Sequence, residues 1–283
     1  MIRESELIIN GDGSVYHLNA KPGQLSPVII TVGDPDRVNM FEKHFDSIIH
    51  RVENREFRII TGKYKNRDIS VLATGIGTDN IDIAMNEIDA LFNIDFATRK
   101  IREDKQKLHF IRIGTSGAIR PEIELDSIII SKYAVGFDGL LHFYNSFELR
   151  DVELENMVNE HLDLKSSYAV RASDKLLEHF KTLGMPGITI TSPGFYGPQS
   201  RSIRLEYKYD IISSLKSISY DSCNCTNLEM ETAGIYGLSN MLGHEAISLN
   251  AILANRANGV FSKQAEDTIH HLIDVALHYV HLL

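Results

Sequence analysis

The sequence predicts an α/β fold in which helices flank a largely parallel or mixed sheet. Short runs rich in Val, Ile, Leu and Thr alternate along the chain with longer stretches whose apolar residues recur at helical spacing. Of the 283 residues, 43% are hydrophobic and 24% are charged, which is typical of soluble globular proteins and excludes collagen, coiled coil and intrinsic disorder. Since no repeat, low-complexity tract or Pro/Ser-rich linker divides the chain, residues 1–283 are predicted to form one domain.

Seven segments are predicted as strands because each is short, rich in β-branched or other apolar residues and, in most cases, closed by Gly, Pro or Asp. They are Val28–Val32, Arg58–Thr61, Ile69–Ala73, His109–Ile113, Ser127–Ser131, Gly187–Thr191 and Ala246–Leu253. Ligands of open α/β sheets bind beyond the carboxyl ends of the strands, so a site is expected in the loops that follow these segments.

Three helices are predicted from capping residues and apolar stripes. The first begins near Asp79 or Asn80, and the second runs from about Glu229 to Leu242 and stops at Gly243. The third reaches the C-terminus with a stripe at Ile269, Leu272, Ile273, Ala276 and Val280. The charged, weakly patterned segment Asn93–Lys107 is predicted to be an exposed helical or loop insertion.

The formal net charge is −9, which disfavours general nucleic-acid binding and requires locally placed arginines for any bound phosphate. No apolar run is long enough to span a bilayer, and the N-terminus lacks the apolar run of a signal peptide. The two cysteines, Cys223 and Cys225, are too few for a disulfide framework. We therefore expect a cytoplasmic protein without a membrane partner.

Three loops after predicted strands join small residues to exposed backbone N–H groups. They are Gly33–Val38 (GDPDRV), Thr74–Thr78 (TGIGT) and Gly114–Ala118 (GTSGA). Arg37 lies in the first loop and Arg112 just before the third, and such a combination can bind an anion without a P-loop. A glycine turn after a strand is more often only a turn, so each loop alone is weak evidence.

Arg112 stands in a predicted strand beside Phe110, Ile111 and Ile113, whose side chains are expected to be buried. An arginine in a strand usually lies on a solvated edge or in a salt bridge. A buried guanidinium needs an anionic partner, so Arg112 is the strongest candidate for a residue that binds an anion.

Two further segments carry side chains suited to a nucleoside. Phe195–Arg201 (FYGPQSR) combines an aromatic ring, an amide and a guanidinium, which together can stack on a planar heterocycle and hydrogen-bond its edge. Asn227–Glu231 (NLEME) places two carboxylates, which can accept from a sugar diol, around a methionine that can cover the ring. Acidic residues also favour helix N-termini, and this explains Glu229 and Glu231 equally well.

The chain has no Walker A sequence, no dinucleotide GxGxxG after a strand, no GxSxG and no HExxH. Its motifs GDPDRV (33–38), REF (55–57), TGIG (74–77), RIGTSGAI (112–119), FYGPQSR (195–201) and NLEMETAGIYG (227–237) instead occur in the order that resembles the nucleoside phosphorylase family, which contains uridine phosphorylases and hexameric purine nucleoside phosphorylases. The resemblance implies a single-domain three-layer α/β/α sandwich with a central mixed, partly barrel-like sheet. It also implies a homodimer with shared active sites, assembled further into a homohexamer.

By this resemblance, Gly33, Arg37, Arg112 and Thr115 bind phosphate, and Arg55 reaches the phosphate of the neighbouring subunit. The two arginines and the threonine of one subunit would then act together with the arginine of the other.

The same resemblance implies that Glu231 and Met230 hold the ribose hydroxyls, with Glu229 alongside. His17 is expected to reach across the dimer to the ribose 5′-hydroxyl.

At the base, Gln199 and Arg201 are similar to the uracil-reading pair of uridine phosphorylases, with Phe195 beside them. A glutamine amide can donate to a carbonyl and accept from an imide N–H, while arginine donates to a second carbonyl. Asn255 stands where hexameric purine phosphorylases place an aspartate that protonates the purine, and asparagine cannot be that acid.

The implied activity is reversible phosphorolysis of uridine to uracil and ribose 1-phosphate, with phosphate as co-substrate and no organic cofactor. The implied catalytic residues are Arg112, Gln199, Arg201 and Glu231. Glu56 matches a glutamate that holds potassium at a dimer interface in some members, but Asn80 replaces its serine partner, which puts the ion in doubt. A purine nucleoside phosphorylase, a nucleosidase and a non-catalytic nucleoside-binding protein remain as alternatives.

Overall fold

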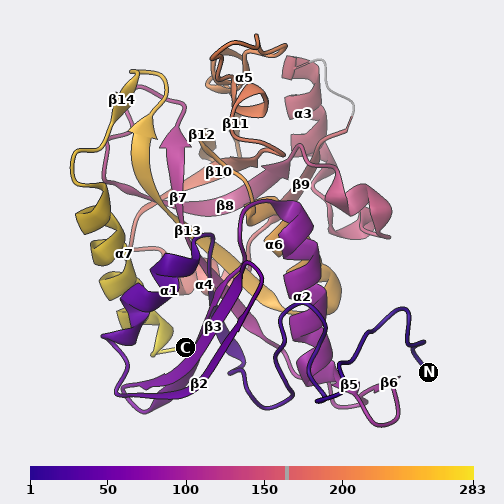
Figure 1. Ribbon diagram of the computed structural model, residues 1–283. Helices are drawn as coiled ribbons and strands as arrows, with labels where there is room; N and C mark the ends of the chain where they lie inside the picture. The colour runs from indigo at the N-terminus through magenta and orange to yellow at the C-terminus, as the bar shows by residue number, and fades with distance from the viewer. Residues whose placement is uncertain (163–165) are drawn as a thin grey trace.

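The computed structural model describes residues 1–162 and 166–283, in which helices cover both faces of a central sheet (Figure 1). The strands are β1 (Val28–Val32), β2 (Ser47–Asn54), β3 (Phe57–Tyr64), β4 (Arg67–Ala73), β5 (Ile94–Asp95), β6 (Lys100–Ile101), β7 (His109–Ala118), β8 (Ile128–Gly136), β9 (Tyr168–Arg171), β10 (Met185–Thr191), β11 (Ser219–Tyr220), β12 (Cys223–Glu229), β13 (Glu245–Asn255) and β14 (Val260–Phe261). The helices are α1 (Pro35–Glu42), α2 (Thr78–Asn93), α3 (Val152–Leu162), α4 (Asp174–Phe180), α5 (Ile211–Leu215), α6 (Thr232–Leu242) and α7 (Ala265–Val280), with 3₁₀ turns at Leu140–Phe143, Phe147–Leu149 and Gly197–Gln199.

Five strands close into a barrel at one end of the sheet. The order β12-β10-β8-β13-β7 returns to its start because β7 also pairs with β12. From β7 the sheet continues through β1, β4, β3 and β2. Parallel pairs, such as β1 with β7, and antiparallel pairs, such as β8 with β13, both occur. The predicted mixed, partly barrel-like sheet is therefore confirmed.

The hydrophobic core lies on both faces of this sheet. Ile29 of β1 belongs to a cluster built with α2 and α6, whereas the next residue, Ile30, belongs to one built with α1, α4 and α7. Successive side chains of a strand point to opposite faces, so the two clusters are the two interfaces of an α/β/α sandwich. None of the helices in the described part of the chain has the length and apolar composition needed to cross a bilayer.

All seven predicted strands are present, with ends that differ by a few residues. The prediction missed β2, β9 and β12, as well as the short β5, β6, β11 and β14. The helices predicted near Asp79 and at the C-terminus correspond to α2 and α7.

Two predicted boundaries are wrong at the site. Gly114–Ala118, predicted as a loop, continues β7, because it pairs with β13 as far as Asn255 and with β12 at Gly117 and Ala118. The helix predicted from Glu229 begins only at Thr232, and Glu229 is the last residue of β12.

Beyond Asn93, which is the last residue of α2, the insertion Asn93–Lys107 is not helical. It contains the two-stranded hairpin β5–β6, in which Ile94 pairs with Ile101. Arg99 has a positive φ of 54°, and the Asp95 side chain accepts from two backbone N–H groups in the turn. Polar turn residues rather than apolar periodicity therefore build this segment.

Candidate active site

A cavity of about 810 Å³ opens beyond the carboxyl ends of β1, β4 and β12, beside the second half of β7. This is the position expected for a ligand site in such a sheet. Ten of the predicted site residues line it: Gly33, Arg37, Arg112, Thr115, Phe195, Gln199, Arg201, Glu229, Met230 and Glu231. Their elements come from distant parts of the chain, and only the fold brings them together.

Two arginines from different elements, Arg37 of α1 and Arg112 of β7, line the cavity. Asp34 caps α1 by accepting from the backbone N–H of Asp36, which fixes the turn that carries Arg37. Burial and the nearby charge of Arg112 lower the pKa of Arg37. A half-buried guanidinium whose charge is disfavoured by a second, buried one provides a place where an anion is stabilised.

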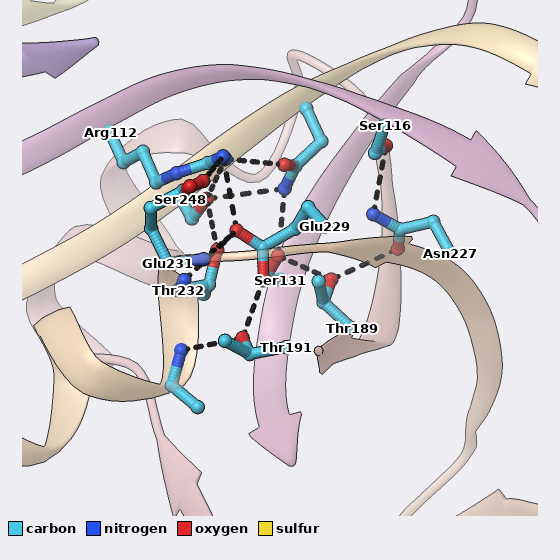
Figure 2. A network of polar contacts seen from close by, with 12 residues as sticks. Arg112, Ser116, Ser131, Thr189, Thr191, Asn227, Glu229, Glu231, Thr232 and Ser248 are labelled. Carbon is cyan, nitrogen blue, oxygen red and sulfur yellow. Dashed lines mark hydrogen bonds and ion pairs between the residues drawn. The ribbon is translucent and has the colours of Figure 1, made fainter. Parts of the chain in front are cut away.

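The anionic partner predicted for Arg112 is present. Its Nη2 lies 2.6 Å from Glu231 Oε2 and 3.0 Å from Glu229 Oε2, and all three side chains are buried (Figure 2). Burial alone would lower the pKa of Arg112, but the two carboxylates outweigh it and raise that pKa. The guanidinium therefore stays charged inside the protein.

Glu229 is held by the protein itself. Thr191 Oγ1 donates to Glu229 Oε1 at 2.5 Å, and the backbone N–H groups of Glu231 and Thr232 both donate to Oε2 at 2.9 Å. The carboxylate, at the end of β12, therefore accepts from two backbone N–H groups at the start of α6 that have no partner within the helix. This contact corrects the predicted helix start, because Glu229 caps the helix from outside it.

Glu231 is more open to the cavity. Its Oε1 accepts from the backbone N–H of Gly77 at 2.8 Å, and its Oε2 accepts from Arg112. Burial raises the pKa of Glu231, Arg112 opposes this shift, and the neighbouring Glu229 adds to it. Met230, between the two glutamates, also lines the cavity.

Gln199 and Arg201 also line the cavity, and Arg201 fixes Gln199. Arg201 Nη1 donates to Gln199 Oε1 at 2.6 Å and to the backbone oxygen of Phe195 at 2.7 Å. Its guanidinium lies 3.7 Å from the centre of the Phe195 ring. Burial and the neighbouring Arg256 lower the pKa of Arg201 to about 10, so the group is charged at neutral pH. Within the described residues Gln199 Nε2 has no hydrogen-bond partner, and Oε1 keeps a second lone pair, so the amide can still donate and accept.

Sequence analysis gave no role to Arg256 or Ser116. Arg256 donates to the backbone oxygens of Gln199 and Ser200 at 3.0 and 3.1 Å, and so supports the segment that carries Gln199. Ser116 lines the cavity from β7. The available signal for Arg256 is an arginine three residues after the last predicted strand, whereas Ser116 lies in a segment predicted to be a loop.

Asn255 is buried and turned away from the cavity. Its Nδ2 donates to the backbone oxygens of Arg120 and Ile123 at 3.0 and 2.8 Å, and its Oδ1 accepts from the N–H of Asn258. The side chain therefore orders the loop after β7.

Glu56 and Asn80 both line the cavity near Gly75. Gly75 has a φ of 73°, and a Cβ there would lie 2.5 Å from Asn80 Nδ2. The amide of Asn80 thus fills the space against the glycine.

His17 and Arg55 do not line the cavity of their own chain. They lie near each other instead, because Asn54 Nδ2 donates to the His17 backbone oxygen and Arg55 lies over the Tyr16 ring at 5.2 Å. Glu87 accepts from the backbone N–H and from Nδ1 of His17, the latter at 2.6 Å.

The sequence pattern of the Phosphorylase superfamily matches residues 27–278. A uridine phosphorylase of Thermococcus kodakarensis is 33% identical over 258 residues, which cover 90% of this chain and 82% of that protein. A DeoD-type purine nucleoside phosphorylase of Buchnera aphidicola is 27% identical over 271 residues, covering 94% and 99%. The crystal structure of a Trypanosoma brucei nucleoside phosphorylase, reported to show uridine phosphorylase activity, matches with a TM-score of 0.90 at 27% identity and covers 98% of this chain and 100% of that one. The chain therefore belongs to the phosphorylase superfamily and is a member of its nucleoside phosphorylase family of pentosyltransferases.

Proposed function

We propose that this protein catalyses the reversible phosphorolysis of uridine to uracil and ribose 1-phosphate. The observation that carries the proposal is the pairing of Gln199 with Arg201 in the same cavity as Arg37 and Arg112. The first pair offers donors and an acceptor for the uracil edge, and the second offers positive charge for phosphate.

In the proposed mechanism, the glycosidic bond lengthens first and the ribose gains oxocarbenium character. Phosphate, held by Arg37, Arg112 and Thr115, stabilises that positive charge from below the ring and then forms the bond to the anomeric carbon. Glu231 orients the ribose through its hydroxyls. The electron pair of the broken bond passes to uracil, whose oxygens are met by Gln199 and Arg201. Holding both reactants in one cavity supplies part of the rate enhancement.

We further propose that the active unit is a homodimer, assembled into a homohexamer, in which His17 and Arg55 serve the partner's cavity. Both residues lie on one surface outside the cavity of their own chain, which is compatible with a role across an interface. The proposed reaction takes inorganic phosphate as co-substrate and needs no organic cofactor.

The second candidate is phosphorolysis of purine nucleosides, which the similarity to the Buchnera aphidicola enzyme favours. Asn255 argues against it, because an amide cannot protonate a leaving purine and this one is bound to backbone groups.

An absorbance assay of uridine, thymidine and inosine, each with and without inorganic phosphate, tests the proposal. We expect uridine to be cleaved only when phosphate is present, and faster than inosine. Faster inosine cleavage would select the purine alternative, phosphate-independent cleavage a nucleosidase, and no cleavage of any substrate a binding protein.

Gln199→Ala tests the base assignment. Each buried partner left unsatisfied costs about 1–3 kcal/mol, so kcat/KM for uridine should fall roughly 10- to 1,000-fold. The KM for phosphate should stay near the wild-type value because Arg37 and Arg112 are untouched. Gln24→Ala is the control, since Gln24 binds Lys21 outside the cavity. A Gln199→Ala enzyme with wild-type kcat/KM for uridine would remove Gln199 from the site.

A further inference from the structure

A chain of polar side chains crosses the interior of the barrel from Arg112 to Ser116 (Figure 2). Arg112 Nη1 donates to Asn250 Oδ1 at 2.8 Å, and Asn250 Nδ2 donates to Ser131 Oγ at 2.9 Å. Ser131 and Thr189 are joined by a hydroxyl contact of 2.6 Å. The chain ends as Thr189 Oγ1 donates to Asn227 Oδ1 at 2.9 Å and Asn227 Nδ2 donates to Ser116 Oγ at 3.0 Å.

The direction of every hydrogen bond in this chain is determined. Asn227 Oδ1 can only accept, so the single hydroxyl proton of Thr189 is donated to it. Ser131 must then donate to Thr189, and Ser131 Oγ is left to accept from the Nδ2 of Asn250. The same order follows from the other end, because Arg112 can only donate and therefore faces the carbonyl oxygen of Asn250.

Both Nη atoms of the Arg112 guanidinium have hydrogen-bond acceptors within the protein. Nη2 faces Glu229 and Glu231, while Nη1 donates to Asn250 and, at 3.4 Å, to Ser248 Oγ. Each Nη atom carries two protons, so these four partners account for all of them. Among the described residues Nε has no hydrogen-bond partner, and Arg112 lines the cavity.

We propose that Asn250 is a positioning residue for phosphate binding: its amide oxygen, oriented by Ser131 and Thr189, holds Arg112 so that the guanidinium meets both Glu231 and the anion. Asn250 is fully buried and does not line the cavity, so it acts only through Arg112. Among the residues that the structure describes, no other neutral acceptor is as close to Nη1, because Ser248 lies 0.6 Å farther away (3.4 against 2.8 Å). This inference rests on the proposed phosphorolysis for its effect on phosphate.

Asn250→Ala is the first test. The loss of an acceptor for a charged donor should raise the KM for phosphate about 10- to 100-fold, with a much smaller change in the KM for uridine. A crystal structure of the variant should show the Arg112 guanidinium displaced from its wild-type position. Asn93→Ala is the matched control, since Asn93 is an equally buried asparagine that binds Asp89 and Gln106 far from the cavity.

Asn250→Asp is the second variant, in case the alanine protein does not fold. Aspartate keeps the shape and the acceptor, but its ionised form adds a third carboxylate to Glu229 and Glu231 around Arg112 and has no donor for Ser131. Its KM for phosphate should therefore rise as pH increases, relative to the wild type measured at the same pH. A protonated aspartate restores the donor, so the low-pH value should approach that of the wild type.

An unchanged Arg112 position, or equal changes in the KM values for phosphate and uridine, would overturn the role of Asn250. The crystallographic comparison does not depend on the reaction. If the wild-type protein cleaves uridine without phosphate, the proposed function fails while the position of Arg112 still decides the inference.

Discussion

The negative charge of Glu231 is subject to opposing influences, because burial and Glu229 disfavour it while Arg112 favours it. Its carboxylate is buried beside Glu229, and it receives one backbone N–H from Gly77 and one guanidinium from Arg112. The formal charges of Glu229, Glu231, Arg112 and Arg37 cancel. Burial makes the ionised carboxylate of Glu231 costly, so its hydrogen bonds to Gly77 and Arg112 can be exchanged for contacts with a bound sugar diol or anion.

The pH dependence of stability tests this account of Glu231. Burial raises its pKa above the ordinary 4.5, so between those two values the folded chain binds a proton that the unfolded chain releases. Protonated Glu231 therefore contributes stability at low pH, and this contribution is lost as pH rises through the raised pKa. We expect the free energy of unfolding of the wild type, relative to Glu231→Gln, to be larger at pH 5 than at pH 8.

Urea unfolding of both proteins at each pH measures the difference, because groups distant from Glu231 titrate alike in the two and only its close neighbours, Glu229 and Arg112, are perturbed with it. A stability difference that grows toward pH 8 would show that the folded protein lowers the pKa of Glu231 instead.

At the scale of elements, one wall of the cavity depends on the hydrogen bonds that hold β14 and the start of α7 in position. Phe261 of β14 lines the cavity although its side chain is largely exposed. The next residue, Ser262, donates to Asp126 Oδ1 at 2.5 Å, and Thr268 of α7 donates to the same atom at 2.7 Å. Gln264 donates to Asp126 Oδ2. One aspartate therefore holds the short strand and the start of the last helix against the loop before β8.

Asp126→Ala should loosen these elements. The variant loses the acceptor of three hydrogen bonds and places alanine at a φ of 66°, so we expect a loss of about 2–4 kcal/mol in the free energy of unfolding. Asp126→Asn keeps a residue suited to this backbone and should lose less. Thermal unfolding of both variants makes the comparison, and equal Tm values for Asp126→Ala and wild type would refute the anchoring role.

At the scale of the whole molecule, one chain does not present an excess of positive charge to phosphate, because two glutamates balance Arg37 and Arg112 in the cavity. Arg55 is exposed, has a positive φ of 54°, and lies with Tyr16 and His17 on a separate surface. A phosphate dianion would gain a net attraction if a neighbouring chain supplied this third arginine.

Hybrid dimers test that arrangement. Arg55→Ala and Glu231→Ala proteins should each be inactive, but a hybrid dimer has one cavity with both groups intact. Random re-association after refolding together should therefore restore about a quarter of the wild-type activity. Arg55→Ala refolded with the Arg55→Ala/Glu231→Ala double variant is the control, since no cavity then holds both groups. Verified hybrid dimers without activity would assign Arg55 to its own chain.

Several features could be predicted from the sequence because they are local or are carried by apolar residues. The seven predicted strands are runs with buried β-branched side chains, and α2 and α7 have regular apolar stripes. Some of the site residues could be proposed because glycine turns and arginines follow or end these strands, whereas the roles of Glu229 and Glu231 came from the resemblance to the nucleoside phosphorylase family. The burial of Arg112 and its need for an anion could be anticipated from Phe110, Ile111 and Ile113 alone.

Only the tertiary structure showed which polar segments form the strands of the barrel and how their side chains pair inside it. The strand β12 reads Cys-Asn-Cys-Thr-Asn-Leu-Glu, and the second half of β7 is Gly-Thr-Ser-Gly-Ala, so neither shows the apolar pattern of a buried strand. Both are strands because polar side chains such as Asn227 find their hydrogen-bond partners on other strands, 38 residues away at Thr189 and 111 away at Ser116. A sequence pattern reports burial through apolar residues, whereas a buried polar group is stable only beside a partner that the fold brings to it.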